Sequence, residues 1–101
     1  MIEIETNKFD IVKELKTKRD IDGFISAFIK EAEEADSIEQ ILYALGIAAK
    51  ARGMLKTAND AGVNREQLYK SLSKTGNPSF KTIFNVAKSL GYKVTFEPIK
   101  K

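Results

Sequence analysis

The sequence predicts a mainly α-helical fold, a bundle of about five to six helices built around a helix-turn-helix, with a short strand near each end of the chain. Apolar residues recur at intervals of three and four along most of the chain, which is typical of amphipathic helices. Residues 54–73 predict two short helices on either side of a tight turn. Residues 1–6 and 92–97 instead alternate apolar and polar side chains, as half-exposed strands do.

Two helices are expected before residue 37. A short helix over residues 9–16 is predicted by three apolar side chains at three-residue spacing, Phe9, Val12 and Leu15. Asp20 is a suitable cap for the helix that follows, because its carboxylate can accept from the amides of a first turn. The apolar stripe of that helix consists of Ile21, Phe24, Ile25, Phe28, Ile29 and Ala32. Its end, residues 31–36, is strongly acidic, which opposes the helix dipole.

A third, longer helix is predicted to begin after Ser37, which forms a capping-box pattern with Gln40. Gly53 marks its end, because glycine adopts the positive φ that often follows a helix. This helix should brace the helix-turn-helix. Its expected inner face consists of Ile38, Ile41, Leu42, Leu45, Ala48 and Ala49.

Residues 54–73 match what a DNA-binding helix-turn-helix requires. A small face of Thr57, Ala58 and Ala61 allows a close crossing of two helices. Gly62 supplies a positive φ at the turn, Val63 is an apolar plug and Asn64 is a good N-cap. The second helix then directs Leu68 and Leu72 inward, one turn apart. The pattern favours contact with DNA.

The outer side of that second helix carries polar groups that reach base edges or phosphates from a major groove. Helical periodicity places Glu66, Lys70 and Lys74 farthest outward, with Gln67 and Tyr69 beside them. In the first turn, Arg65 suits guanine; Gln67 suits adenine, and Glu66 can accept from cytosine. The alternative is a solvated face on which Glu66 and Lys70 form a weak surface pair.

The last helix is expected after a turn at residues 73–79. Pro78 suits a first helical position, with Asn77 or Ser79 as the cap. Gly91 ends the helix, and Pro98 stops the strand that follows. The two terminal strands could pair within one chain, across a dimer, or with a partner's sheet edge. The expected inward residues of this helix are Phe80, Ile83, Phe84, Val86, Ala87 and Leu90.

Composition bounds the function. A chain of 101 residues fits one domain. Within it we expect an N-terminal extension (residues 1–36), a helix-turn-helix core (residues 37–91), and a C-terminal strand and tail (residues 92–101). There is no Cys and no His, so disulfides, thiolate metal sites and the commonest general base are excluded. We expect no cofactor, no metal and no catalysis, since the carboxylates form no constellation.

Charge is divided unevenly along the chain. Residues 1–49 carry 6 Lys/Arg and 11 Asp/Glu, a net charge of −5, whereas residues 50–101 carry 11 and 3, a net charge of +8. The basic half, which contains the turn motif, fits a polyanion, and the acidic half suits either a basic protein or plain solvation. No run is apolar enough to cross a bilayer and no signal peptide opens the chain, so a cytoplasmic protein is expected.

Three motifs lie between Ala44 and Tyr92: Ala-Leu-Gly-Ile-Ala-Ala-Lys-Ala-Arg-Gly-Met (44–54), Ala-Gly-Val-Asn-Arg-Glu-Gln-Leu-Tyr-Lys-Ser-Leu-Ser (61–73) and Gly-Asn-Pro-Ser-Phe-Lys-Thr (76–82). Together with Phe9-Asp10 and the helix after it, they resemble the HigA-like addiction-module antidote proteins, a branch of the Cro/lambda-repressor-type helix-turn-helix regulators. The resemblance implies a homodimeric antitoxin of a type II toxin-antitoxin module. It would bind double-stranded operator DNA, repress its own operon and neutralise a small basic toxin, RelE/HigB-like, encoded alongside. The alternative is a stand-alone repressor of the same fold without a toxin.

The resemblance also assigns positions. The residues expected to contact DNA are Lys56, Thr57, Asn64, Arg65, Glu66, Gln67, Tyr69, Lys70, Lys74, Asn77, Ser79 and Lys81. For the toxin, the net charge of residues 1–49 and the basic character of such toxins favour an acidic segment or a terminal strand. The acidic residues expected there are Glu31, Glu33, Glu34, Asp36 and Glu39.

Overall fold

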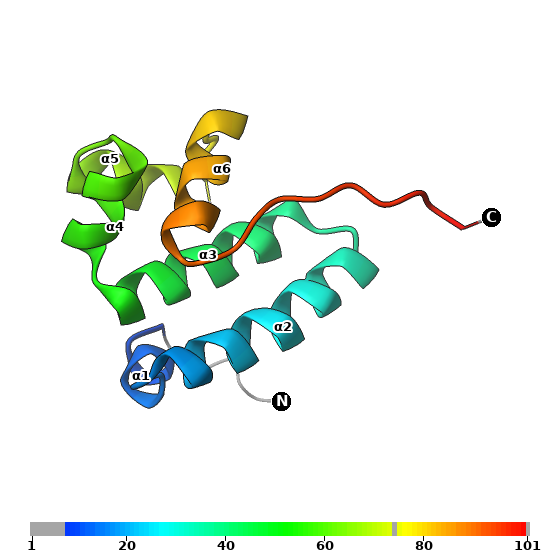
Figure 1. Cartoon of the computed structure of the whole chain (residues 1–101), viewed down its shortest axis with the longest axis horizontal. Coiled ribbons are helices and arrows are strands. Elements are labelled where there is room, and N and C mark those ends of the chain that lie inside the picture. Colours follow the sequence, from blue (N-terminus) through cyan, green and yellow to red (C-terminus); the bar gives the residue numbers. More distant parts are fainter. Residues whose placement is uncertain (1–7, 74, 101) are drawn as a thin grey trace.

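The computed structural model describes residues 8–73 and 75–100, and side-chain surroundings from residue 11 onward. Over these residues the chain forms helices and no strand. Figure 1 shows a lower layer in which α2 and α3 run alongside each other, with α1 at the start of α2 and with α4, α5 and α6 grouped above α3. The helices are α1 (Lys8–Glu14), α2 (Lys18–Glu34), α3 (Ile38–Arg52), α4 (Met54–Ala61), α5 (Arg65–Ser71) and α6 (Phe80–Ser89).

The hydrophobic core is centred on α3. The core joins Ile21 and Ile25 of α2 to Leu68 of α5 and Val86 of α6. It also includes Leu42, Leu45, Ala48 and Ala49 of α3, which were expected to point inward. Ile41 is half-buried against this core, and Ile38 is largely exposed at the first position of the helix. Two further residues of α3 are fully buried, Ala44 and Ile47. Because α3 contacts α1, α2, α4 and α6, it is buried on more than one face, and a single inner face was too narrow a prediction.

Helix α6 is less buried than its sequence pattern predicted. Val86, Ala87 and Leu90 are buried, whereas Phe80 and Phe84 are exposed. The two rings lie one turn apart with their centroids 6.2 Å from each other. The prediction that both phenylalanines point inward is therefore wrong, because the core contacts only one side of this short helix.

The helix starts are fixed by hydroxyl caps. Thr17, and not Asp20, is the N-cap of α2: its side chain accepts from the Asp20 amide at 3.1 Å, while the Asp20 carboxylate accepts from the Thr17 amide at 3.1 Å. Ser37 caps α3 as predicted, accepting from the Gln40 amide. Ser79 caps α6, so Pro78 precedes the cap instead of opening the helix. Each cap satisfies an amide that the helix itself leaves without a partner.

A polar cluster connects three helices at one end of the bundle. Arg52, at the end of α3, donates to Ser89 of α6 and to Asp60 of α4, the latter at 3.2 Å. Ser89 also donates to Asp60 at 2.9 Å. These hydrogen bonds from Ser89 and Arg52 lower the pKa of the Asp60 carboxyl from its ordinary value of 3.8. The cluster consists of residues that sequence periodicity does not single out.

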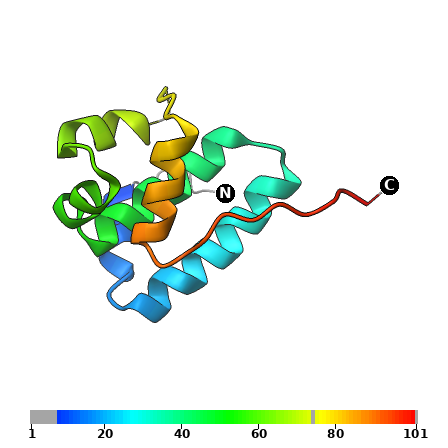
Figure 2. The same cartoon turned by 45° about the horizontal axis from the view of Figure 1, so that its top comes forward.

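After Gly91 the chain continues as an extended tail across α3 and away from the helices (Figures 1 and 2). Tyr92 holds the start of the tail, since its hydroxyl donates to Asp22 of α2. Burial and this bond raise the pKa of Tyr92 from 10.0 to about 12. The predicted strand over residues 92–97 is wrong, because residues 92–100 form no strand; the predicted strand at residues 1–6 lies outside the described residues.

Among the described residues, no helix combines the length and the apolar character needed to cross a bilayer.

The polar cluster predicts how stability responds to acid. Replacing Asp60 with Asn should lower the free energy of unfolding at pH 7, because the carboxylate that accepts from Arg52 and Ser89 is lost. Since the folded pKa of Asp60 is depressed, its contribution is present above pH 3.8 and is lost as the pH falls through the folded value. The stability difference between wild type and Asp60→Asn should therefore shrink below pH 3.8.

Urea unfolding followed by far-UV circular dichroism at several pH values measures that difference. Glu33→Gln, which changes an exposed carboxylate of α2 outside the polar cluster, provides the matched control and should change stability little at any pH. If the stability difference between wild type and Asp60→Asn stays constant down to about pH 2, the link between this difference and the protonation of Asp60 is contradicted.

Candidate nucleic-acid interface

The candidate site is built on α4, α5 and the turn between them. Gly62 ends α4 in the left-handed region (φ 76°, ψ 25°), as its sequence position predicted. Val63 is half-buried against the core. Asn64 then caps α5 through a capping box: its side chain accepts from the Gln67 amide at 2.7 Å, and the Gln67 side chain accepts from the Asn64 amide at 3.2 Å. Residues 62–64 therefore fix the direction in which α5 starts.

Packing decides which side of α5 faces solvent. Leu68 is fully buried and Leu72, at the C-cap, is nearly so, and both belong to the core. The turn is tight because Ala58 and Ala61 of α4 are also buried, leaving no side chain to separate the helices. The opposite side of α5 is exposed over its whole length, and its members are Arg65, Glu66, Gln67, Tyr69 and Lys70. This set, the α5 ridge, is where the sequence expected it.

The α5 ridge has a further basic neighbour. The ammonium of Lys50, near the end of α3, lies 5.3 Å from the centre of the Tyr69 ring, a cation–π contact. A shallow hollow beside this pair is also lined by Arg65 and by exposed Leu55. Sequence reasoning missed Lys50 as part of this surface. The available signal was its place at the start of the basic half of the chain.

The remaining residues expected to contact DNA have mixed surroundings. Lys56 of α4 is exposed, but Thr57 is fully buried, so the prediction that Thr57 contacts DNA is wrong. Its place in the helix crossing removes it from solvent. Asn77 and Lys81 are exposed on either side of the exposed cap Ser79, at the start of α6. Lys74 lies outside the described residues.

The acidic group expected to meet a basic protein lies at the far end of the molecule from α5, around the turn between α2 and α3 (Figure 1). All five members are exposed: Glu31, Glu33, Glu34, Asp36 and Glu39. The backbone at Asp36 has φ 55°, which turns the chain sharply between the two helices. Among the described residues, the ion pairs join Lys18 to Asp22 and Arg52 to Asp60, and neither involves this group. Within the group, Glu39 accepts a hydrogen bond from the Ser37 hydroxyl at 3.4 Å.

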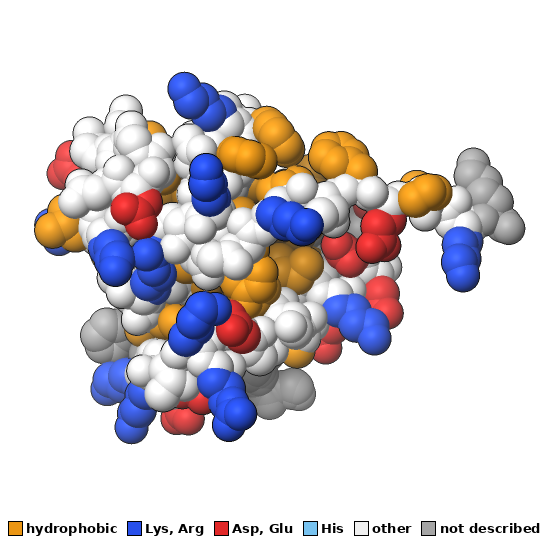
Figure 3. Space-filling view, in the orientation of Figure 1, with side chains coloured by type: hydrophobic (Ala, Val, Ile, Leu, Met, Phe, Trp, Pro, Cys, Tyr) orange, Lys and Arg blue, Asp and Glu red, His pale blue; other side chains and the backbone are white. Residues whose placement is uncertain are grey.

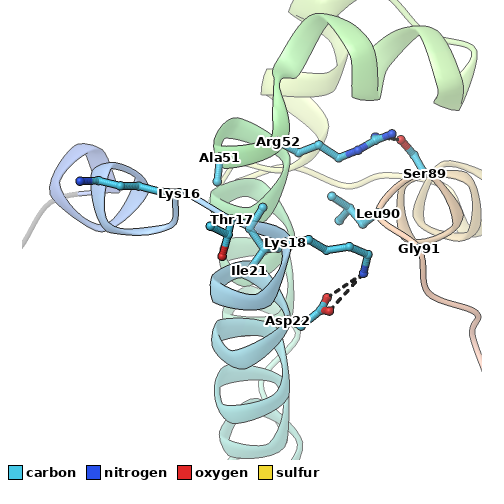
Figure 4. A pocket seen from close by; sticks show the side chains of 10 residues that line it. All are labelled: Lys16, Thr17, Lys18, Ile21, Asp22, Ala51, Arg52, Ser89, Leu90 and Gly91. Atoms are coloured by element: carbon cyan, nitrogen blue, oxygen red, sulfur yellow. Dashed lines mark hydrogen bonds and ion pairs between the residues drawn. The ribbon is translucent and has the colours of Figure 1, made fainter.

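The pocket drawn in Figure 4 lies between the start of α2 and the ends of α3 and α6, with a volume of about 380 Å³. Three of its charged side chains, Lys18, Asp22 and Arg52, are engaged within the protein. Lys18 pairs with Asp22 at 3.1 Å, and Arg52 points toward Ser89. The bonds from Tyr92 and Lys18 lower the pKa of Asp22. We assign this pocket to the packing of the tail, and the part of the chain that is described contains no cluster of metal ligands.

Comparison with known proteins gives the family. A sequence model described as "probable addiction module antidote protein" matches residues 5–98. A protein of Haemophilus influenzae described only as uncharacterized is 45% identical over 82 residues, which cover 81% of this chain and 80% of the relative. No solved structure matches the chain. Because the family match spans nearly the whole sequence, this chain belongs to the addiction module antidote proteins.

Proposed function

We propose that this antidote binds operator DNA through α4 and α5, as a helix-turn-helix of the Cro/lambda-repressor type, and represses the operon that encodes it and its toxin. The observation that supports this is the α5 ridge, an exposed polar surface held in place by the buried Leu68 and Leu72. The net charge of +8 on residues 50–101 also supports binding to DNA, because a basic surface attracts a polyanion. The protein acts by binding and not by catalysis.

The exposed residues divide into two roles by their chemistry. Arg65 and Gln67 lie in the first turn of α5 and are suited to base edges in the major groove. Lys56, Lys70 and Lys81 supply phosphate contacts, which give affinity and salt dependence. Further contacts are assigned to the remaining exposed or undescribed polar residues of the predicted set: Asn64, Glu66, Tyr69, Lys74, Asn77 and Ser79. A homodimer would present two α5 helices to successive major grooves about 34 Å apart.

The acidic group at the α2–α3 turn is assigned to the toxin. Family membership supports a toxin partner, and five exposed carboxylates complement a small basic protein of the RelE/HigB-like kind. Since this group and the α5 ridge are at opposite ends of the molecule (Figure 1), one antidote could hold toxin and operator together.

Replacing Lys70 with Ala tests the DNA interface. If Lys70 contacts phosphate, affinity should fall by the same factor for the operator and for an unrelated duplex. The slope of log affinity against log salt should decrease in magnitude by about 0.9, the value for one lost phosphate contact. Fluorescence anisotropy with a labelled duplex from the DNA upstream of the gene, titrated across a salt series, measures both quantities.

Lys30→Ala is the matched control, because Lys30 is an exposed lysine of α2 and the change in net charge is the same. It should leave the salt slope unchanged. An equal loss in the two variants, or a wild-type titration that stays flat at low ionic strength, would exclude α5 as the DNA-binding element. A changed order of preference among duplexes would assign Lys70 to base contact instead.

Charge reversal at Glu34 tests the toxin-binding assignment. Glu34→Lys places a like charge against a basic partner and should slow association by on the order of tenfold at low salt, with less effect on dissociation. Surface plasmon resonance with the protein encoded beside the antidote gives both rates. Glu66→Lys makes the same charge change on α5 and should leave toxin association unaltered; equal slowing by both variants would refute the assignment.

A further inference from the structure

We propose that the dimer forms by exchange of tails: residues 93–100 of each protomer, the exchanged tail, lie across the exposed face of α6 in a second copy of this chain. That face is defined by Phe80 and Phe84 and is called here the α6 aromatic face. The inference rests on the proposed function, because the proposed operator binding requires a dimer. It adds the surfaces through which the two protomers contact each other.

In the described part of the chain, the α6 aromatic face is left largely open to solvent. Phe80 is 59% exposed and Phe84 is 42% exposed, although the two rings contact each other in a tilted arrangement with centroids 6.2 Å apart. The opposite side of α6 is already used, since Val86 and Leu90 belong to the core. In Figure 3, hydrophobic side chains gather over the region of α6 and continue along the tail. Two adjacent exposed phenylalanines on a small domain indicate a surface that another molecule covers.

The tail has the complementary property. Its side chains alternate as in a strand: Tyr92 and Val94 are half-buried against the protomer, while Lys93 and Thr95 are exposed. The next residue of the apolar series, Phe96, is 85% exposed, and Ile99 is 83% exposed. The described chain after Tyr92 makes no backbone hydrogen bond to another described residue, the last being from the Tyr92 amide to Ala87. The tail therefore presents both apolar side chains and free backbone groups.

Both exposed surfaces belong to the same chain, which favours a second copy over another protein as the occupant. In a two-fold dimer each protomer gives one tail and receives one, so a single kind of contact covers Phe96, Ile99, Phe80 and Phe84 together. The tail leaves its own domain instead of folding back onto α6, as Figures 1 and 2 both show. The contact uses no residue of α5 and none of the acidic group; at the start of α6 it lies next to Ser79 and Lys81, which are assigned to DNA.

The reach of the tail is sufficient. Eight extended residues span up to about 26–29 Å, at 3.3–3.6 Å per residue. The α6 helix, Phe80–Ser89, has 10 residues and is about 15 Å long. The shortest dimension of the protomer is 28 Å. A tail of this length can lie along the whole of α6 in a neighbour that is in direct contact.

Because the chain has no cysteine, disulfide trapping tests the contact directly. Protein carrying Phe96→Cys is mixed with protein carrying Phe84→Cys or Phe80→Cys and oxidised, without DNA or toxin. A covalent heterodimer should form, since a disulfide requires the two Cβ atoms to approach within about 4.5 Å. Phe96→Cys mixed with Leu55→Cys is the control, because Leu55 is an exposed apolar residue of α4 outside the proposed contact. That mixture should give no heterodimer above background.

Sedimentation equilibrium gives the second measurement. Phe96→Ser should raise the dimer dissociation constant about 30-fold or more, the loss typical of a central aromatic residue at an interface. Circular dichroism should stay unchanged, since Phe96 is outside the core. Ile99→Ser should act in the same direction, and Leu55→Ser should have no effect.

Three results would overturn the inference. The first is a wild-type protein that sediments as the 11.3 kDa monomer. The second is a dimer that Phe96→Ser leaves intact and in which no disulfide is trapped, and the third is a Phe96→Ser variant that loses toxin binding but not dimerisation. The last would assign the tail to the toxin. Since these measurements use neither DNA nor toxin to detect the dimer, loss of operator binding in a protein that still dimerises would refute the proposed function alone.

Discussion

Burial of α3 on several sides is the constraint on which the other elements depend. Its small residues, Ala44, Ala48 and Ala49, have no exposed surface, which lets neighbouring helices approach the α3 backbone closely. The helices before and after it in the chain then meet through it: α1 and α2 on one side, α4 and α6 on another. Helix α5, only seven residues long, has too little length to be stable alone and is positioned through this core by Leu68. A larger residue at Ala48 would therefore disturb the core that holds Leu68, and with it the direction of α5.

Local signals made most of the fold predictable. Glycines with positive φ, serine and asparagine caps, and apolar spacing located the ends of the helices from α3 to α6 within about two residues, and the turn at Gly62 and the orientation of Leu68 were correct. The errors concern which surfaces meet. Periodicity shows that Phe80 and Phe84 are on one side of a helix, but it cannot show that the core of one protomer ends before reaching them. It likewise predicted a strand after Gly91, because alternation does not reveal whether a pairing partner exists.

The candidate site was predictable to the same extent and for the same reason. The α5 ridge follows from helical geometry once Leu68 and Leu72 face inward. The DNA contact of Thr57 was implied only by the family resemblance, whereas its sequence position put it on the small face of the helix crossing, where it is buried. No local pattern identifies the contact between Lys50 and Tyr69 or the cluster of Arg52, Asp60 and Ser89, because each contact joins residues that are apart in the sequence. The acidic group at the α2–α3 turn and the α5 ridge, which come from the two halves of the chain, do lie at opposite ends of the molecule (Figure 1).

The capping box of α5 restricts what Gln67 can offer to a base pair. Its amide oxygen already accepts from the Asn64 backbone with one of its two lone pairs, and this bond holds the Gln67 side chain against the helix start. The two-bond pairing with adenine needs donor and acceptor at once. A pairing that requires the Gln67 side chain to turn away from the helix start would release the Asn64 amide, at a cost of about 1 kcal/mol unless water replaces the bond. Discrimination between bases at this position is thus coupled to fraying of the first turn of the helix.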